Sequence, residues 1–291
     1  MRPIHGSGRA EFPTPPVRVS MCLVLFALDQ HPRWRVVLAA NRDEFYARPT
    51  ARAAPWEDCR GVTAGRDLEA GGTWMGIGPG ARWAALTNVR DLPAHRENAR
   101  SRGDLPARYL CGRPLAHGGT APAASPEDYA REAFRLRQDF NPFNLLVARG
   151  AEVWAVSSHI DAAERVPPGV HGLSNATLDV PWPKVRRGTA ALARELDDPS
   201  LGPEPLFCLL RDAEPAAVAE LPDTGVGVEK ETMLSPVFIA SPDYGTRVST
   251  VLLLEASGEG VFVERATRPE SPEAERAFEI GASGAGLPPR V

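Results

Sequence analysis

Residues 21–45 of the chain read MCLVLFALDQHPRWRVVLAANRDEF. Two apolar, β-rich runs, 22–28 and 35–40, flank a turn near residues 31–32, which is the pattern of a β-hairpin. Antiparallel pairing around this turn places Cys22 opposite about Asn41. The hairpin therefore carries a cysteine at one strand end, beside the polar run 41–44.

The same signals predict three further hairpins, which pair 73–78 with 82–88, 143–148 with 152–157 and 248–255 with 261–266. Helices are predicted from a Ser125 cap to about residue 138, and over 183–196 and 205–212. Strands followed by helices and again by strands predict an α+β fold with antiparallel sheets, not alternating βαβ units.

The open ends of three predicted hairpins carry polar residues. They are the Cys22 end of the first, residues 71–74 with 86–88 of the second, and residues 244–250 of the fourth. Open ends that lie side by side would bring these residues to one edge of a sheet. The hairpin geometry alone therefore predicts a site at that edge.

A single domain is predicted over residues 21–268. Residues 1–20 contain four prolines and no apolar run, which is typical neither of a signal peptide nor of a packed element. Composition favours a disordered arm, with Cys22 an ordinary buried cysteine. The alternative is a translation start at Met21, whose removal would leave Cys22 first. The tail 269–291, rich in Pro, Glu, Ser and Gly, is predicted to be disordered.

Composition excludes several classes of function. The net charge of −4 over 291 residues argues against a nucleic-acid partner. Neither of the two lysines, Lys184 and Lys230, stands in a Gly-Lys-Ser/Thr setting, so a P-loop is excluded. No run approaches the roughly 18 apolar residues of a membrane span. The four cysteines have no metal-ligand spacing, and disulfide frameworks are typical of short secreted chains, so a reducing, cytoplasmic location is predicted.

A cysteine at a chain start can be activated by its own α-amine, whose reference pKa is about 7.7–8.0. Asn88 or Asn175 could donate hydrogen bonds to a developing oxyanion. Asparagines at strand ends more often satisfy backbone groups, and that interpretation is favoured for each one singly.

Arg42 and Asp43 could orient the substrate and the amine. Adjacent strand residues point to opposite faces, however, and a structural Arg–carboxylate pair is a serious competitor. The arginine-rich segment 90–113 could receive an anionic group, but a solvated helical face is the favoured interpretation.

Seven short segments follow one another along the chain: Met21-Cys22, ANRDEF at 40–45, GRDLEAGGTW at 65–74, LTN at 86–88, GLSN at 172–175, PWPKV at 181–185 and YGTRVST at 244–250. Together they resemble the NRDE family, the group that contains the eukaryotic transport and Golgi organisation protein. The resemblance runs from residue 21 to about residue 266. Because the family begins at Met-Cys, it favours a start at Met21.

The family is similar to N-terminal-nucleophile hydrolases, which implies a four-layer αββα sandwich of antiparallel sheets. The similarity implies six site residues: Cys22 as nucleophile and carrier of the base, Arg42 and Asp43 to position it, Asn88 and Asn175 at the oxyanion site, and Arg247 to complete the polar cluster. One departure stands out. Those hydrolases space their arginine and aspartate three residues apart, whereas here the two are adjacent.

Two functions follow from the resemblance. The first is a cysteine amidohydrolase or acyltransferase that acts on a linear amide and requires no cofactor. The second is a non-catalytic carrier of haem or of lipid or acyl-coenzyme A, in which haem is cargo and Arg247 or segment 90–113 meets carboxylates or phosphates. The catalytic ancestry of the fold favours the first. The expected partner is a small molecule in both cases, and the sequence carries no signal for the oligomeric state.

Overall fold

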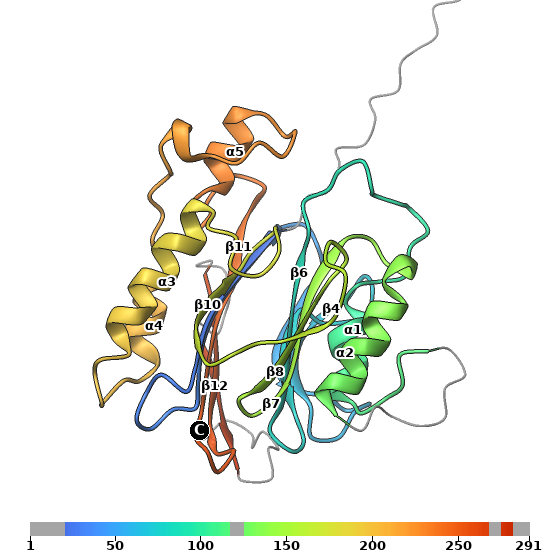
Figure 1. Cartoon of the computed structure of the whole chain (residues 1–291), viewed down its shortest axis with the longest axis vertical. Coiled ribbons are helices and arrows are strands. Elements are labelled where there is room, and N and C mark those ends of the chain that lie inside the picture. Colours follow the sequence, from blue (N-terminus) through green and yellow to red (C-terminus); the bar gives the residue numbers. More distant parts are fainter. Residues whose placement is uncertain (1–20, 117–124, 268–274, 282–291) are drawn as a thin grey trace, which may run out of the picture.

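Two antiparallel sheets face each other in the computed structural model, which describes residues 21–116, 125–267 and 275–281 (Figure 1). The six-stranded sheet has the order β10-β1-β2-β11-β12-β13. Its strands are β1 Met21–Leu28, β2 Val36–Phe45, β10 Gly169–Leu173, β11 Tyr244–Leu254, β12 Gly260–Ala266 and β13 Glu275–Ile280.

The seven-stranded sheet has its strands in sequence order, from β3 to β9. They are β3 Thr50–Pro55, β4 Thr63–Asp67, β5 Met75–Gly78, β6 Arg82–Asn88, β7 Phe143–Arg149, β8 Glu152–Ser157 and β9 Glu164–Arg165. The helices are α1 Asp104–Leu110, α2 Pro126–Arg135, α3 Pro183–Glu195, α4 Pro203–Leu209 and α5 Val228–Leu234, with 3-10 turns at Arg137–Asp139 and Val218–Glu220.

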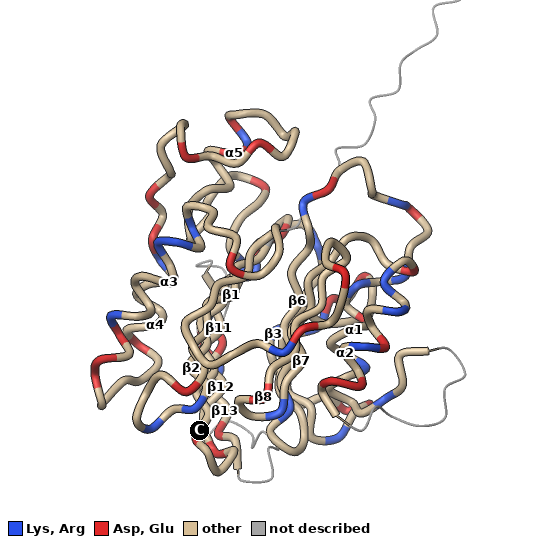
Figure 2. Tube along the Cα trace, in the orientation of Figure 1, with Lys and Arg blue, Asp and Glu red and all other residues tan. Residues whose placement is uncertain are grey.

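Three apolar cores separate four layers. Side chains such as Phe26, Trp83 and Leu146 fill the space between the sheets. Helices α1 and α2 cover the outer face of the seven-stranded sheet, and α3 and α4 cover that of the six-stranded sheet (Figure 1). Charged residues lie mainly on helices and loops, away from the space between the sheets (Figure 2). The expected four-layer αββα sandwich is confirmed. No helix in the described ranges is long and apolar enough to cross a membrane.

The four predicted hairpins are present. Thr250 pairs with Glu264 as expected, whereas Cys22 pairs with Arg42, one residue from the predicted partner. The cap of α2 is also as predicted, because the Ser125 hydroxyl accepts a hydrogen bond from the Asp128 N–H at 3.1 Å. Segment 90–113 is not the predicted helical face, since helix there is confined to Asp104–Leu110.

The disorder predicted after residue 268 is wrong for residues 275–280. Residues 275–280, expected to be disordered, form β13 and pair with β12, where Phe278 and Ile280 complete the core between the sheets. Two buried apolar side chains at alternate positions outweigh the polar composition around them. The predictions for residues 1–20 and for the end of the tail lie outside the described residues.

Cysteine usage also needs correction. Cys59 and Cys111 form a disulfide that joins the β3–β4 turn to the end of α1, while Cys22 is buried and unpaired and Cys208 is exposed. The two cysteines are 52 residues apart in the sequence, so their pairing could not be predicted from a local motif. The cytoplasmic location stays a prediction, and the disulfide removes its main support.

Replacing Cys111 by serine should lower the free energy of unfolding by about 2–4 kcal/mol, because the disulfide restricts the unfolded chain. Urea unfolding of the oxidised protein and of the variant measures the difference. Cys208→Ser is the matched control and should change little, since that thiol is exposed and unpaired. Equal stability of all three proteins would contradict this account.

Candidate functional site

Cys22 lies near the beginning of β1, with its side chain toward the space between the sheets. Its strand alternates between faces, and Val24 and Phe26 on the same side belong to the core between the sheets. The residue is 8% exposed. It borders a cavity of about 10 Å³, also lined by Arg42, Trp74 and Thr250, which is close to the space of one water molecule.

Burial keeps the Cys22 thiol protonated while residue 21 is attached. Loss of solvent, and next the charge of Asp43, raise the pKa of the thiol to about 12. The Arg42 guanidinium and the Asp43 backbone N–H act in the opposite direction. Because only a thiolate is a good nucleophile, Cys22 needs a further base near it before it can react.

Arg42 is directly opposite Cys22 and shares its face. Its guanidinium carbon lies 4.4 Å from the centre of the Trp74 ring, and one of its nitrogens lies 3.6 Å from a Glu44 carboxylate oxygen. Trp74 in turn packs over Gly65, where an added Cβ would approach the ring to 2.0 Å. This packing explains why a glycine precedes Trp74 by nine residues.

Asp43 points to the other face of β2, toward α3. The Thr246 hydroxyl donates to its Oδ1 at 2.6 Å. Burial raises the pKa of the Asp43 carboxyl to about 7, against the lowering charge of Lys184. On the same face, the Asn41 amide donates to the carbonyls of Leu210 and Val237 at 2.9 and 2.8 Å. The predicted alternation is therefore confirmed, and Asn41 is a structural residue.

The structure brings Asn88 and Asn175 together across the two sheets. The Asn175 side-chain amide donates to the Asn88 carbonyl at 2.8 Å, and its Oδ1 accepts from the Ser174 hydroxyl. That hydroxyl also lies 3.2 Å from the Cys22 carbonyl oxygen, which competes with Asn175 for its single proton. Asn175 therefore follows directly after a residue, Ser174, that contacts the Cys22 backbone, and Asn88 is linked to it through Asn175.

Arg247 is placed differently from the expected cluster. The pairing of β11 with β2 shifts between Thr246 and Val248, which leaves Arg247 as the bulged residue. Its guanidinium donates to the carbonyls of Phe45 and Arg48 in the turn after β2. Neither contact reaches Cys22, so a role for Arg247 in the site stays a prediction.

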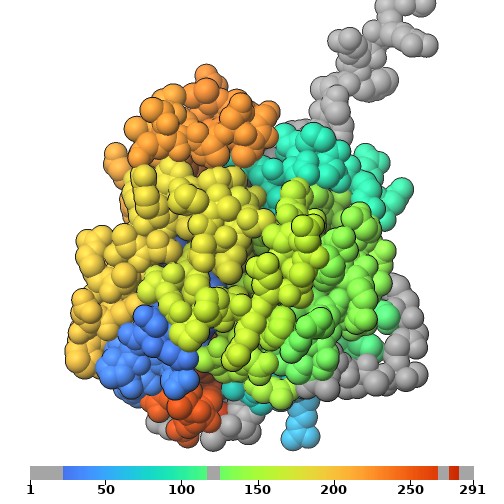
Figure 3. Space-filling model, in the orientation of Figure 1, coloured from blue at the N-terminus to red at the C-terminus, as the bar shows by residue number. Residues whose placement is uncertain are grey.

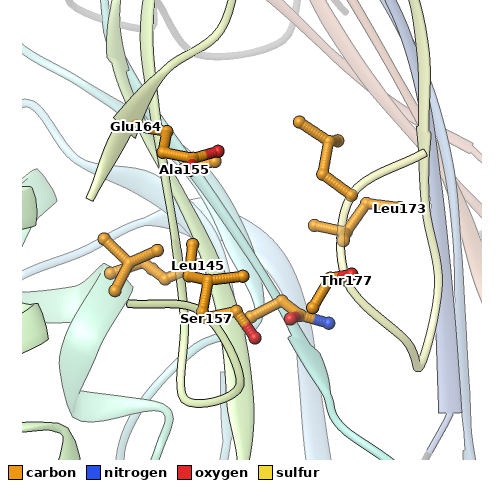
Figure 4. Close-up of a pocket in the computed structure, with 10 residues that line it drawn as sticks. Leu145, Ala155, Ser157, Glu164, Leu173 and Thr177 are labelled. Carbon is orange, nitrogen blue, oxygen red and sulfur yellow. The ribbon is translucent and has the colours of Figure 1, made fainter. Parts of the chain in front are cut away.

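Two larger cavities flank the site. One of about 440 Å³ is lined by Arg90, Asn175, Trp182 and Thr224 among others, and it falls within the roughly 300–1,000 Å³ typical of ligand sites. The second, of about 120 Å³, lies between the sheets and has a mixed polar and apolar lining (Figure 4). Leu145 and Ala155 line it from one sheet and Leu173 from the other.

Comparison with known proteins identifies the family. The model of the family described as Transport and Golgi organisation 2 matches residues 21–269. The chain belongs to this family. The Transport and Golgi organization protein 2 homolog of Bos taurus is 35% identical over 271 residues, covering 84% of this chain and 92% of that protein. The Homo sapiens homolog is 33% identical over 266 residues, with the same coverage.

The Drosophila melanogaster Transport and Golgi organization protein 2 is 28% identical over 273 residues, covering 84% of this chain and 91% of that protein. Among solved structures, the Caenorhabditis elegans N-acylethanolamine-hydrolyzing acid amidase ortholog aligns with a TM-score of 0.40 and 13% identity. The alignment covers 80% of this chain and 92% of that chain.

Sequence reasoning missed two basic residues of this Transport and Golgi organisation 2 family member. Lys184, the second residue of α3, is buried beside Asp43 and acts electrostatically on it. Arg102 is also near the thiol. Burial lowers the pKa of its guanidinium to about 10, whereas the charges of Glu44 and Cys22 act to raise it. Two signals were available for Lys184: the rarity of lysine in the sequence and its place in the PWPKV segment at 181–185.

The 440 Å³ cavity of this family member is bordered by a buried ion pair. Arg90 binds Glu231 of α5, and Glu231 also accepts hydrogen bonds from the Thr224 N–H and hydroxyl at 3.0 and 2.5 Å. Figure 3 shows the orange segment that carries α5 above the yellow α3. Within the described residues, no group of three His, Cys, Asp or Glu side chains could hold a metal ion.

Proposed function

We propose that the protein is an N-terminal cysteine amidohydrolase or acyltransferase, active after removal of residues 1–21. The position of Cys22 carries the proposal. It faces the space between the sheets opposite Arg42, and its backbone nitrogen adjoins residue 21, the partner of Asp43 in the register. A chain that starts at Cys22 would have its α-amine beside its own thiol, which supplies the missing base.

The reaction would follow in balanced steps. The neutral α-amine accepts the thiol proton, and the thiolate sulfur attacks the carbonyl carbon of a linear amide. The tetrahedral intermediate collapses as its C–N bond breaks, and the α-ammonium returns the proton to the leaving amine. Water, or an acyl acceptor in the transferase variant, then releases the acyl group from the thioester.

Asn175 is the proposed donor to the oxyanion. An amide nitrogen carries two N–H groups, and one of those of Asn175 donates to the Asn88 carbonyl. The second can donate to a substrate oxygen, and Asn88 would contribute by fixing the orientation of the amide. Arg42, held against Trp74 and Glu44, would keep the thiolate side of the site positive.

The state of the N-terminus tests the proposal. Intact mass of the protein from its native host should show a chain that begins at Cys22. A panel of linear amides should be turned over by that form and left intact by the full chain of 291 residues, in which the Cys22 nitrogen is an amide. A native protein that retains residues 1–21 would rule the proposal out.

The second candidate is a carrier of haem or of an acyl ligand, with no catalytic step. The 440 Å³ cavity favours it, because Arg90 and Trp182 line a space of ligand size beside Asn175. Haem titration followed by absorbance tests this function. A Soret shift at micromolar protein would support it, and the absence of a shift would count against haem as cargo.

A further inference from the structure

Lys184 is a buried cation to which the proposed reaction assigns no step. Its side chain begins in the first turn of α3 and is 2% exposed. Its Nζ makes no hydrogen bond with any group in the described part of the chain. Burying an ammonium costs several kcal/mol unless nearby charges compensate, so the charges that face Lys184 determine whether it can be accommodated there.

The charges that face Lys184 come from four elements. They are Asp43 of β2, Cys22 of β1, Arg90 after β6 and Glu231 of α5. Glu231 is bound by Arg90 and Thr224, which makes Asp43 the carboxylate that balances Lys184. Burial lowers the pKa of the Lys184 ammonium to about 8 and raises that of the Asp43 carboxyl to about 7.

The strand register places this pair at the end of β1. Residue 21 pairs with Asp43, so a chain that begins at Cys22 has its α-amine next to that carboxylate. Of the cations that act on Asp43, Lys184 has the larger effect and Arg42 the smaller. Without Lys184, the carboxylate would therefore stabilise the ammonium form of the amine more strongly. An α-ammonium cannot accept a proton, and the Cys22 thiol would lose its base.

We propose that Lys184 is a positioning residue of the Cys22 site. Its ammonium balances Asp43, so that the α-amine of Cys22 stays uncharged near neutral pH and accepts the proton of the thiol. The inference rests on the proposed function, because it concerns the form of the protein that begins at Cys22.

The first test follows Cys22 alkylation by iodoacetamide across pH, with intact mass as the readout. Every described element lies within residues 21–281. A chain expressed from Met21, which loses that methionine, therefore retains all of them except the first residue of β1. Cys208→Ser in all samples removes the exposed free thiol. Removing a positive charge raises the proton affinity of neighbouring groups, so Lys184→Met should shift the pH midpoint upward by about one unit.

Two variants separate this role from a structural one. Lys184→Arg keeps the charge and should keep the midpoint. Lys184→Met combined with Asp43→Asn removes both charges and should return the midpoint close to that of the parent. A Lys184→Met variant that melts like the parent and keeps its midpoint would overturn the proposal.

A second measurement needs neither alkylation nor a variant in the site. The sequence has two lysines, so ¹³Cε-labelled lysine gives two NMR signals, and Lys230→Arg assigns them. The Lys184 titration should move between the full chain and the chain that begins at Cys22, because only the latter has an amine beside Asp43. An identical titration in both would overturn the proposal. Neither test uses a substrate, so both can still be interpreted if no amide in the panel is turned over.

Discussion

Replacing Cys22 by alanine is expected to abolish amide turnover, with a loss of at least about 10⁴-fold in rate, as for other covalent nucleophiles. The reason is chemical, since no other free thiol among the described residues lies in this site: Cys208 is exposed, and Cys59 and Cys111 are joined. The rate of the best substrate in the amide panel, measured on a chain that begins at residue 22, gives the result.

The matched control for this variant is Cys208→Ala, which removes the other unpaired cysteine and should leave the rate unchanged. Melting temperatures check that both variants fold. A Cys22→Ala protein that keeps a tenth or more of the parent rate would mean that the sulfur is not the nucleophile. The carrier function would then become the better account of the fold.

The second large effect is expected at Glu231. Replacing it by alanine should lower the free energy of unfolding by about 3–5 kcal/mol, because a buried charge loses its partner. Arg90 and Glu231 are both almost fully buried, and the same carboxylate accepts two hydrogen bonds from Thr224. Urea unfolding followed by circular dichroism measures the loss.

Glu229→Ala provides the control on the same helix, since Glu229 is exposed. Its effect should stay within about 0.5 kcal/mol, as for most surface substitutions. A Glu231 variant no less stable than the Glu229 variant would show that the ion pair does not hold α5 in place.

Local patterns in the sequence predicted the strands around the site well. The 22–28 and 35–40 runs predicted the first hairpin to within one residue of its register, because both of its strands are apolar. The period of two along β2 predicted that Arg42 and Asp43 point to opposite faces. In the structure Glu44 contacts Arg42 on one face, and Asn41 shares the other face with Asp43. The same alternation means that the adjacent Arg42 and Asp43 lie on opposite faces of the sheet and have different surroundings.

Contacts between distant segments could not be predicted in the same way. The bulge that directs Arg247 to the turn after β2 depends on the pairing of β11. Lys184 and Asp43 meet only when α3 packs on the six-stranded sheet. The strand of residues 275–280 could not be predicted because most residues around it are polar. Its two buried side chains, Phe278 and Ile280, become evident only when the strand pairs with β12.

The burial of Lys184 also determines how the protein can be attached or labelled. Lys230, on α5, is the exposed one of the two lysines. Apart from the α-amine, an amine-reactive biotin or fluorophore ester should therefore modify one position. That position gives a defined point for immobilising the protein or for measuring distances to a bound ligand, without acylation of the buried Lys184.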